Sequence, residues 1–182
     1  TQQADAVAEG LRRLETNWDQ PVSNAGARVN DTLNHWRAIG AAAPTLPKEN
    51  WRYQMYLFRA CYDAYVQHRA VAEAVAETRA LEALRDAKKL GPEEAVAKAK
   101  TALAAETTDA DIASLRGCLD DLGKALLASI GYQLSAKPPY NGKSPERGAV
   151  LDYLDTPLNS RVWLTGEMQA ALEKKTRRSR VN

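Results

Sequence analysis

Histidine and cysteine are scarce in this chain, which has two of each among its 182 residues. His35 and His68 belong to no HxxxH, HExxH or ExxH pattern, and Cys61 and Cys118 belong to no CxxC or mixed Cys/His spacing. Metal sites are usually built from such spacings, and covalent haem attachment needs a CxxCH motif. The sequence therefore predicts neither a metal site nor a cofactor.

Long hydrophobic runs are missing as well. The longest charge-free stretch of interest, residues 125–136, is far shorter than the roughly 20 apolar residues of a transmembrane helix. We therefore expect no membrane span. The chain opens with Thr1 and shows no secretory signal pattern, which suggests a processed chain or a piece of a longer polypeptide. The compartment stays open, and a secreted or cell-surface location is favoured over the cytoplasm.

Neither sign of charge dominates, because 25 Lys and Arg residues stand against 23 Asp and Glu residues. No global field would steer the protein towards nucleic acid, which we do not expect as a partner. A local excess exists in residues 173–180, which hold five basic residues and one acidic residue. This pattern is typical of a solvated helix C-terminus, and contact with phosphate or anionic lipid is the alternative.

Catalytic motifs are also lacking in the sequence. No Gly-rich phosphate loop follows a strand, no nucleophile elbow is present, and two histidines are a thin supply of general bases. The sequence therefore favours a protein without catalytic activity.

What the chain does contain is a concentration of aromatic and aliphatic side chains in residues 51–65. As a helix, this segment would be apolar nearly all round and would form the centre of a helical core. A stacking platform for sugars or bases is the alternative, but it would need the tyrosines on one exposed side. The apolar members are Trp51, Tyr53, Met55, Tyr56, Leu57, Phe58, Cys61, Tyr62 and Tyr65.

Hydrophobic periodicity along the chain predicts an all-α bundle of about four to six helices, some of them long. Apolar positions keep one helical phase from Val7 to Trp36, straight across Pro21. This phase favours a single kinked helix over residues 3–39, and the alternative is a second helix that begins near Asp19 with Pro21 in its first turn. Further helices are expected over residues 48–90, 92–106, 110–130 and 167–178.

The composition changes in residues 135–165, which are rich in turn-forming residues but also hold apolar residues that can be buried. We expect this irregular segment to wrap the bundle, so that residues 1–182 form a single domain. Polar and aromatic side chains that could bind a glycan or a small molecule gather here, because binding groups concentrate in irregular segments. The candidates are Tyr140, Arg147, Asp152, Asp155 and Trp163. The alternative is structural: the two aspartates would cap turns or pair with nearby arginines.

The two cysteines lie in apolar helical contexts. They are expected to be buried free thiols, since unpaired cysteine behaves as a small hydrophobe. A disulfide that joins Cys61 to Cys118 across two neighbouring helices is the alternative, and it would indicate an extracytoplasmic location.

Two stretches carry a resemblance to known proteins. WRYQMYLFRACYDAY at residues 51–65 and ERGAVLDYLDTPLNSRVWL at residues 146–164 resemble α-helical regions near the ends of large bacterial multidomain proteins, including ones linked to carbohydrates. The resemblance implies an accessory module and brings no catalytic motif.

We therefore expect a non-catalytic helical bundle module for packing or recognition within a larger bacterial protein. Its partners would be other domains of that protein or a separate protein. The alternative function is a glycan or small-molecule binding domain that uses residues 140–163.

Overall fold

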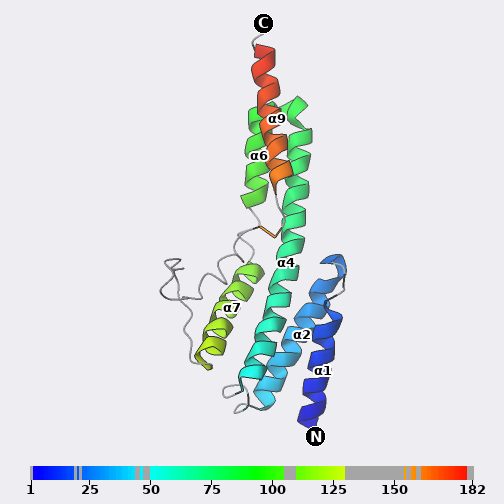
Figure 1. The fold of residues 1–182 in the computed structure, drawn as a ribbon. Coiled ribbons are helices and arrows are strands. Elements are labelled where there is room, and N and C mark those ends of the chain that lie inside the picture. The colour runs from blue at the N-terminus through cyan, green and yellow to red at the C-terminus, as the bar shows by residue number, and fades with distance from the viewer. Residues whose placement is uncertain are drawn as a thin grey trace. The chain divides into compact units, whose positions relative to one another are not determined.

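A computed structural model shows the chain as a set of helices, with no strand among the residues described (Figure 1). These are residues 2–18, 20, 22–43, 46, 50–104, 110–129, 154, 157–158 and 161–179. The all-α prediction is confirmed, although the described part alone holds more helices than the four to six expected. The helices are α1 (Gln2–Thr16), α2 (Val22–Ala42), α4 (Trp51–Arg85), α5 (Ala87–Leu90), α6 (Pro92–Ala104), α7 (Ala110–Ser129) and α9 (Val162–Ser179).

The chain forms two compact units. Unit 1 consists of Thr1–His68 and Asp111–Thr156, and unit 2 consists of Arg69–Ala110 and Pro157–Asn182. The 35-residue helix α4 contributes to both units, and each unit has its own cluster of buried apolar side chains. The prediction of a single domain over residues 1–182 stays a prediction.

The favoured prediction of one kinked helix over residues 3–39 is wrong, because α1 ends at Thr16 and α2 begins at Val22. The amides of Asn17 and Trp18 donate to carbonyls only three residues back, which tightens the last turn of α1. A proline at position 21 has no amide to donate and would clash with the carbonyl four residues earlier in a continuous helix. The helices keep a common apolar phase because α1 and α2 lie side by side in unit 1 (Figure 1).

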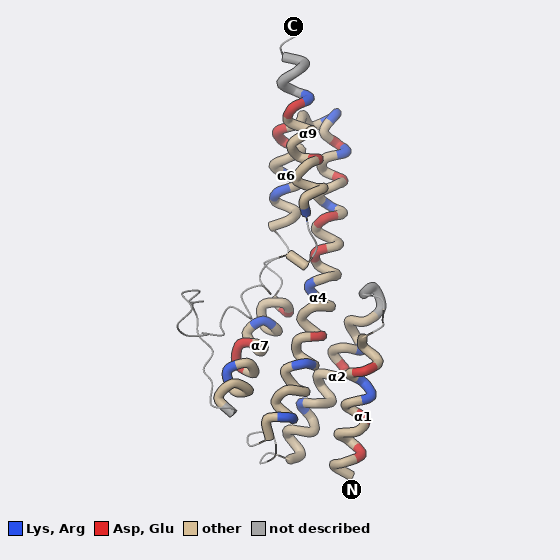
Figure 2. The backbone as a smooth tube through the Cα atoms, in the orientation of Figure 1, with Lys and Arg blue, Asp and Glu red and all other residues tan. Residues whose placement is uncertain are grey.

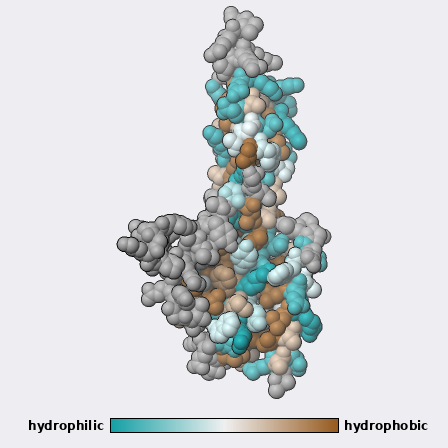
Figure 3. All heavy atoms as spheres, in the orientation of Figure 1, coloured by the Kyte–Doolittle hydropathy of each residue, from teal (hydrophilic) through white to brown (hydrophobic). Residues whose placement is uncertain are grey.

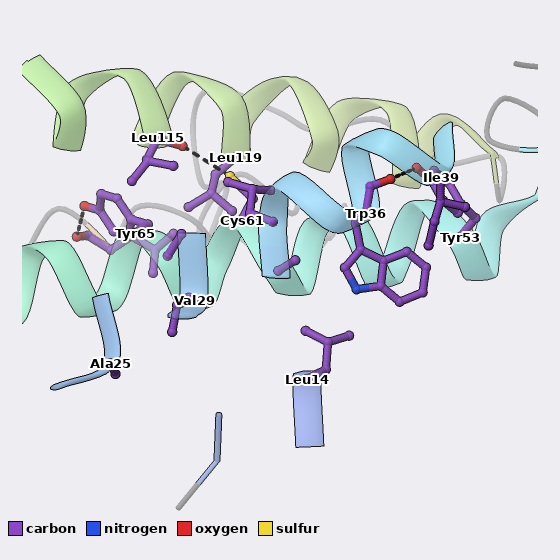
Figure 4. Packing of buried hydrophobic residues seen from close by; sticks show 14 residues of the cluster. Leu14, Ala25, Val29, Trp36, Ile39, Tyr53, Cys61, Tyr65, Leu115 and Leu119 are labelled. Atoms are coloured by element: carbon purple, nitrogen blue, oxygen red, sulfur yellow. Dashed lines mark hydrogen bonds between the residues drawn. The ribbon is translucent and has the colours of Figure 1, made fainter. Parts of the chain in front are cut away.

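Trp36 of α2 is the largest fully buried side chain of unit 1. Its ring centroid lies 5.7 Å from that of Tyr53 in an edge-on arrangement and 5.2 Å from that of Tyr56. The Tyr53 hydroxyl donates to the Trp36 carbonyl, and the Tyr65 hydroxyl donates to the Leu154 carbonyl at 2.8 Å (Figure 4). The aromatic residues of α4 therefore hold the core together through both their rings and their hydroxyls.

Helix α4 begins after Asn50, whose side-chain oxygen accepts from the amides of Arg52 at 3.0 Å and Tyr53 at 3.3 Å. This is an N-cap. The segment over residues 51–65 contributes to the core as predicted, but its first turns reach the surface, since Trp51 and Met55 are exposed. The Arg52 guanidinium stacks on Trp51, with 4.8 Å between the guanidinium carbon and the ring centroid. Such a cation–π contact lets the ring stay in water at lower cost.

Helix α7 packs on the aromatic helix, as the sequence predicts. Its leucines Leu115 and Leu119 share the core cluster of unit 1 with the small residues Ala60, Cys61 and Ala64 of α4 (Figure 4). Small side chains on α4 allow the leucines of α7 to approach closely and fill the space between the helices.

Unit 2 uses alanine in the same way. Ala80 of α4, Ala99 of α6 and Leu164 of α9 are fully buried together, and α6 packs beside α9. The turn before α6 contains Gly91 at φ +86°, a conformation that glycine adopts without steric cost, and Pro92 then occupies the first position of α6. The final helix begins at Val162, five residues before the predicted start.

Candidate functional site

Most of the predicted ligand-binding residues cannot be placed. Tyr140, Arg147, Asp152 and Asp155 lie outside the described residues. Trp163 lies in the first turn of α9, and 46% of its surface is exposed. It is one of several large apolar side chains that are exposed. Figure 3 shows hydrophobic residues in brown at the surface, between hydrophilic residues in teal.

The two cysteines meet in unit 1. Cys61 is fully buried, and its thiol lies 3.6 Å from the Leu115 carbonyl oxygen, one helical turn before Cys118 (Figure 4). Cys118 is half-buried and accepts a hydrogen bond from Nη2 of Arg37 at 3.7 Å. Both cysteines are free in the structure, and the disulfide that is the alternative on the sequence stays a prediction. Three helices thus bring two thiols and one guanidinium together: α2, α4 and α7.

The two thiols affect each other's protonation. A hydrogen bond from the Cys61 thiol, and then the guanidinium of Arg37, lower the pKa of Cys118 to about 6, against the opposing effect of burial. The same hydrogen bond to Cys118, together with burial, raises the pKa of Cys61 well above its ordinary value. Near neutral pH the pair therefore consists of one thiolate, Cys118, and one thiol, Cys61.

A small cavity lies beside this pair in unit 1. It has a volume of about 230 Å³ and is lined by polar side chains from α2, α4 and α7 together with two leucines. Asn30 donates to Nε2 of His68 across 2.6 Å within it. Its wall includes Arg37, which also contacts Cys118, and Ser114, four residues before Cys118 on α7. Arg37 thus contacts both the cavity and the sulfur of Cys118, while neither cysteine lines the cavity.

Unit 2 carries a larger concave surface, which we name the basic-rimmed groove. Its volume is about 730 Å³, and it is formed by α4, α5, α6 and α9. Leucine, proline and alanine supply most of the floor, while the three cationic side chains and one carboxylate of the lining are exposed and form its rim. Figure 2 marks the positions of charged residues along the backbone of these helices. The lining residues are Leu81, Leu84, Arg85, Ala87, Lys88, Pro92, Glu167, Ala170, Ala171 and Lys174.

A buried carboxylate fixes the start of α9 in unit 2. The side chain of Glu73 is fully buried, and its two oxygens accept from the Leu158 amide at 2.9 and 3.0 Å. Nε of Arg69 lies 3.1 Å from the same carboxylate, and Arg161 pairs with Glu77 at 3.2 Å. Buried and partly buried charged groups of α4 therefore anchor the residues that lead into α9, which forms one wall of the basic-rimmed groove.

Both histidines have structural partners. Nε2 of His35 lies 3.0 Å from the Ala6 carbonyl oxygen, and His68 accepts from Asn30. Within the described part of the chain, no three His, Cys, Asp or Glu side chains gather as a set of metal ligands. None of the helices described there has both the length and the apolar character of a membrane span.

No protein-family model, curated protein or solved structure matches this chain.

Sequence reasoning missed two functional features that the structure reveals. Arg37 is 81 residues from Cys118 in the chain, so no local motif links them. The cations of the basic-rimmed groove come from three helices, and only Lys174 belongs to the basic segment over residues 173–180. The sequence offered one signal for this groove, the four-residue spacing that places Leu81 and Arg85 on the same face of α4. That spacing is too common on solvated helices to identify a binding site.

Proposed function

We propose that this chain is a non-catalytic helical module that packs against or recognises another protein segment. That segment would belong either to another domain of a larger protein or to a separate protein. The observation that carries the proposal is the basic-rimmed groove of unit 2, with its apolar floor and cationic rim.

The groove has the features that a docked helix requires. Recognition of an amphipathic helix depends on an apolar groove that receives side chains spaced three and four residues apart. The floor offers Leu81 and Leu84 from one side and Ala170 and Ala171 from the other, and the alanines leave room for side chains of a partner. Burial of an apolar helix face in this groove would favour association by about 25 cal/mol for each Å² of apolar area removed from water, before the entropic cost of association.

The rim favours a partner with acidic residues. Arg85, Lys88 and Lys174 outnumber the single carboxylate of Glu167. Exposed charges of this kind add specificity and speed of association more than affinity, because water and salt screen them. We therefore infer that the partner segment is an amphipathic helix whose polar edge carries Asp or Glu.

The use of the aromatic side chains supports a role without catalysis. Tyr53 and Tyr65 are almost fully buried, and their hydroxyls are engaged by main-chain carbonyls. Hydroxyls that satisfy buried backbone acceptors do not serve a substrate without breaking those bonds.

Photo-crosslinking tests the proposal. A photo-reactive amino acid replaces Ala171 in the groove of the full chain, expressed in its source organism, and a matched replacement of Thr101 on the exposed side of α6 is the control. We expect position 171 to crosslink to one protein segment with an apolar helical repeat and acidic residues. The same products from both positions, or none from position 171, would contradict the proposal.

A charge-reversal pair tests the role of the rim. Lys88→Glu with Lys174→Glu should reduce the crosslink yield several-fold at low salt, whereas Lys98→Glu with Lys100→Glu, exposed on α6 outside the groove, should leave it unchanged.

Turnover of a substrate in a broad hydrolase panel, abolished by Asp152→Ala or Asp155→Ala, would overturn the non-catalytic role.

Glycan binding is the second candidate function, because the exposed ring of Trp163 offers a face on which a sugar can stack. A glycan array and a thermal-shift screen test it, since a ligand of the native state raises the unfolding midpoint. A hit that is lost in Trp163→Ala would favour this function, and no hit in either screen would exclude it.

A further inference from the structure

The thiol pair of unit 1 divides two chemical roles between its members. Cys118 is half-buried, and an exposed arginine, Arg37, donates to its sulfur. Cys61 is fully buried, and its sulfur lies 3.6 Å from the Leu115 carbonyl oxygen on the helix that carries Cys118. Cys118 is therefore partly open to solvent, whereas Cys61 is closed off from it.

We propose that Cys118 is a site of oxidation by peroxides, and that Cys61 resolves the oxidised sulfur into a disulfide between α4 and α7. The substrate is a hydroperoxide, with hydrogen peroxide as the smallest member of that class. The proposal is independent of the groove in unit 2.

The first step is a two-electron oxidation of Cys118. Its thiolate attacks one peroxide oxygen, so that an S–O bond forms and the O–O bond breaks. The leaving oxygen takes up a proton and departs as water or an alcohol. The sulfur becomes a sulfenic acid, and the peroxide is reduced.

The second step is resolution by Cys61. Its sulfur attacks the sulfenic sulfur of Cys118, so that the S–S bond forms and the S–O bond breaks. The hydroxyl leaves with the proton of the Cys61 thiol as water. A dithiol such as reduced thioredoxin or dithiothreitol returns both residues to thiols by exchange.

Two features of unit 1 favour the first step. The Arg37 guanidinium stabilises the thiolate, and it can also donate to the oxygen that leaves. The cavity of about 230 Å³ that includes Arg37 and Ser114 in its wall is large enough to admit hydrogen peroxide to the guanidinium that contacts the Cys118 sulfur, although Cys118 itself does not line it. The buried position of Cys61 favours the second step, because it protects the resolving thiol from direct oxidation.

Peptide mapping of the oxidised protein tests the proposal. The reduced full chain is treated with one equivalent of hydrogen peroxide, and free thiols are then blocked. We expect a Cys61–Cys118 disulfide within single chains, reversed by dithiothreitol. In Cys61→Ala, the sulfenic acid at Cys118 should persist and react with a cyclic 1,3-dione. A Cys118 that stays a thiol under these conditions, or one that links only to other chains, would overturn the proposal.

An arginine pair supplies the matched control. Arg37→Gln should slow oxidation of Cys118 several-fold at pH 7, because it removes one of the two groups that stabilise the thiolate, while the hydrogen bond from Cys61 remains. Arg52→Gln removes a second exposed arginine of unit 1, one that stacks on Trp51, and should leave the rate unchanged. Equal rates in both variants would contradict the role of Arg37.

Discussion

Gly10 shows how one missing side chain sets the distance between two helices. A Cβ atom at this position of α1 would lie 2.7 Å from Cζ2 of Trp36 and 2.9 Å from Cε2. The indole is fully buried, so it cannot move aside without disturbing the core of unit 1. Gly10→Ala should therefore lower the free energy of unfolding of unit 1 by about 1–2 kcal/mol, since overpacking outweighs the gain in helix propensity.

Gly117 of α7 provides the matched control for Gly10. It is an exposed helical glycine with no atom within 4 Å of its would-be Cβ. Gly117→Ala should raise the free energy of unfolding by about 1 kcal/mol through helix propensity alone. Urea titrations followed by circular dichroism measure both changes, and a shift of the same sign in the two variants would refute the argument from the Trp36 contact.

Cys118 makes a prediction about pH. Its pKa is lowered to about 6, first by the hydrogen bond from Cys61 and then by Arg37. Because only the thiolate reacts, the rate of alkylation by iodoacetamide should rise with pH through a midpoint near 6 and level off above pH 7. Mass spectrometry of the Cys118 peptide measures this rate. A midpoint near 8.5, the value of an unperturbed cysteine, would contradict the described pairing.

The start of helix α9 is anchored in part by the carboxylate of Glu73 on helix α4. In Glu73→Gln, the Leu158 amide can keep an acceptor, but the nearly buried Arg69 loses the carboxylate 3.1 Å away. Breaking one side of a buried ion pair costs about 3 kcal/mol. We expect faster hydrogen exchange at the start of α9 and a lower stability of unit 2. Glu82→Gln, at an exposed position on the same helix, should change neither.

At the scale of elements, the sequence predicted best those helices whose ends carry local signals. Pro92 marks the start of α6, and the leucine repeat of α7 predicted both its extent and its packing on α4. The N-cap Asn50 was not recognised, and the helix predicted over residues 48–90 is divided into α4 and α5. The break between α1 and α2 was predicted wrongly because apolar phase can continue across two helices that pack side by side. Phase reports which face is buried, whereas a helix end depends on backbone hydrogen bonds near a proline.

The candidate sites were less predictable than the helices. The sequence identified both cysteines but not Arg37, whose relation to Cys118 exists only after α2 and α7 pack in unit 1. The basic-rimmed groove likewise joins side chains from four helices of unit 2. Sites that are assembled from distant segments leave no spacing in the sequence that could be recognised.

For the whole molecule, the two clusters of buried side chains predict two unfolding transitions. Trp18, Trp36 and Trp51 belong to unit 1 and only Trp163 to unit 2. Fluorescence of Trp163→Phe should therefore follow unit 1, while circular dichroism follows both units. Gly10→Ala should lower one transition and Glu73→Gln the other, and a single transition lowered by both variants would refute this prediction.

The discontinuous course of the chain through its two units determines the order in which they can be completed during synthesis. The first segment of unit 2, Arg69–Ala110, is synthesised before the second segment of unit 1, Asp111–Thr156. The second segment of unit 2, Pro157–Asn182, is synthesised after both. Until that segment is present, the Glu73 carboxylate lacks the hydrogen bond from the Leu158 amide. Ala80 and Ala99 also lack their contact with Leu164. During synthesis there is therefore a stage at which all of unit 1 has been made while unit 2 is still incomplete and its apolar side chains are exposed. Exposed apolar surface of this kind is what chaperones bind.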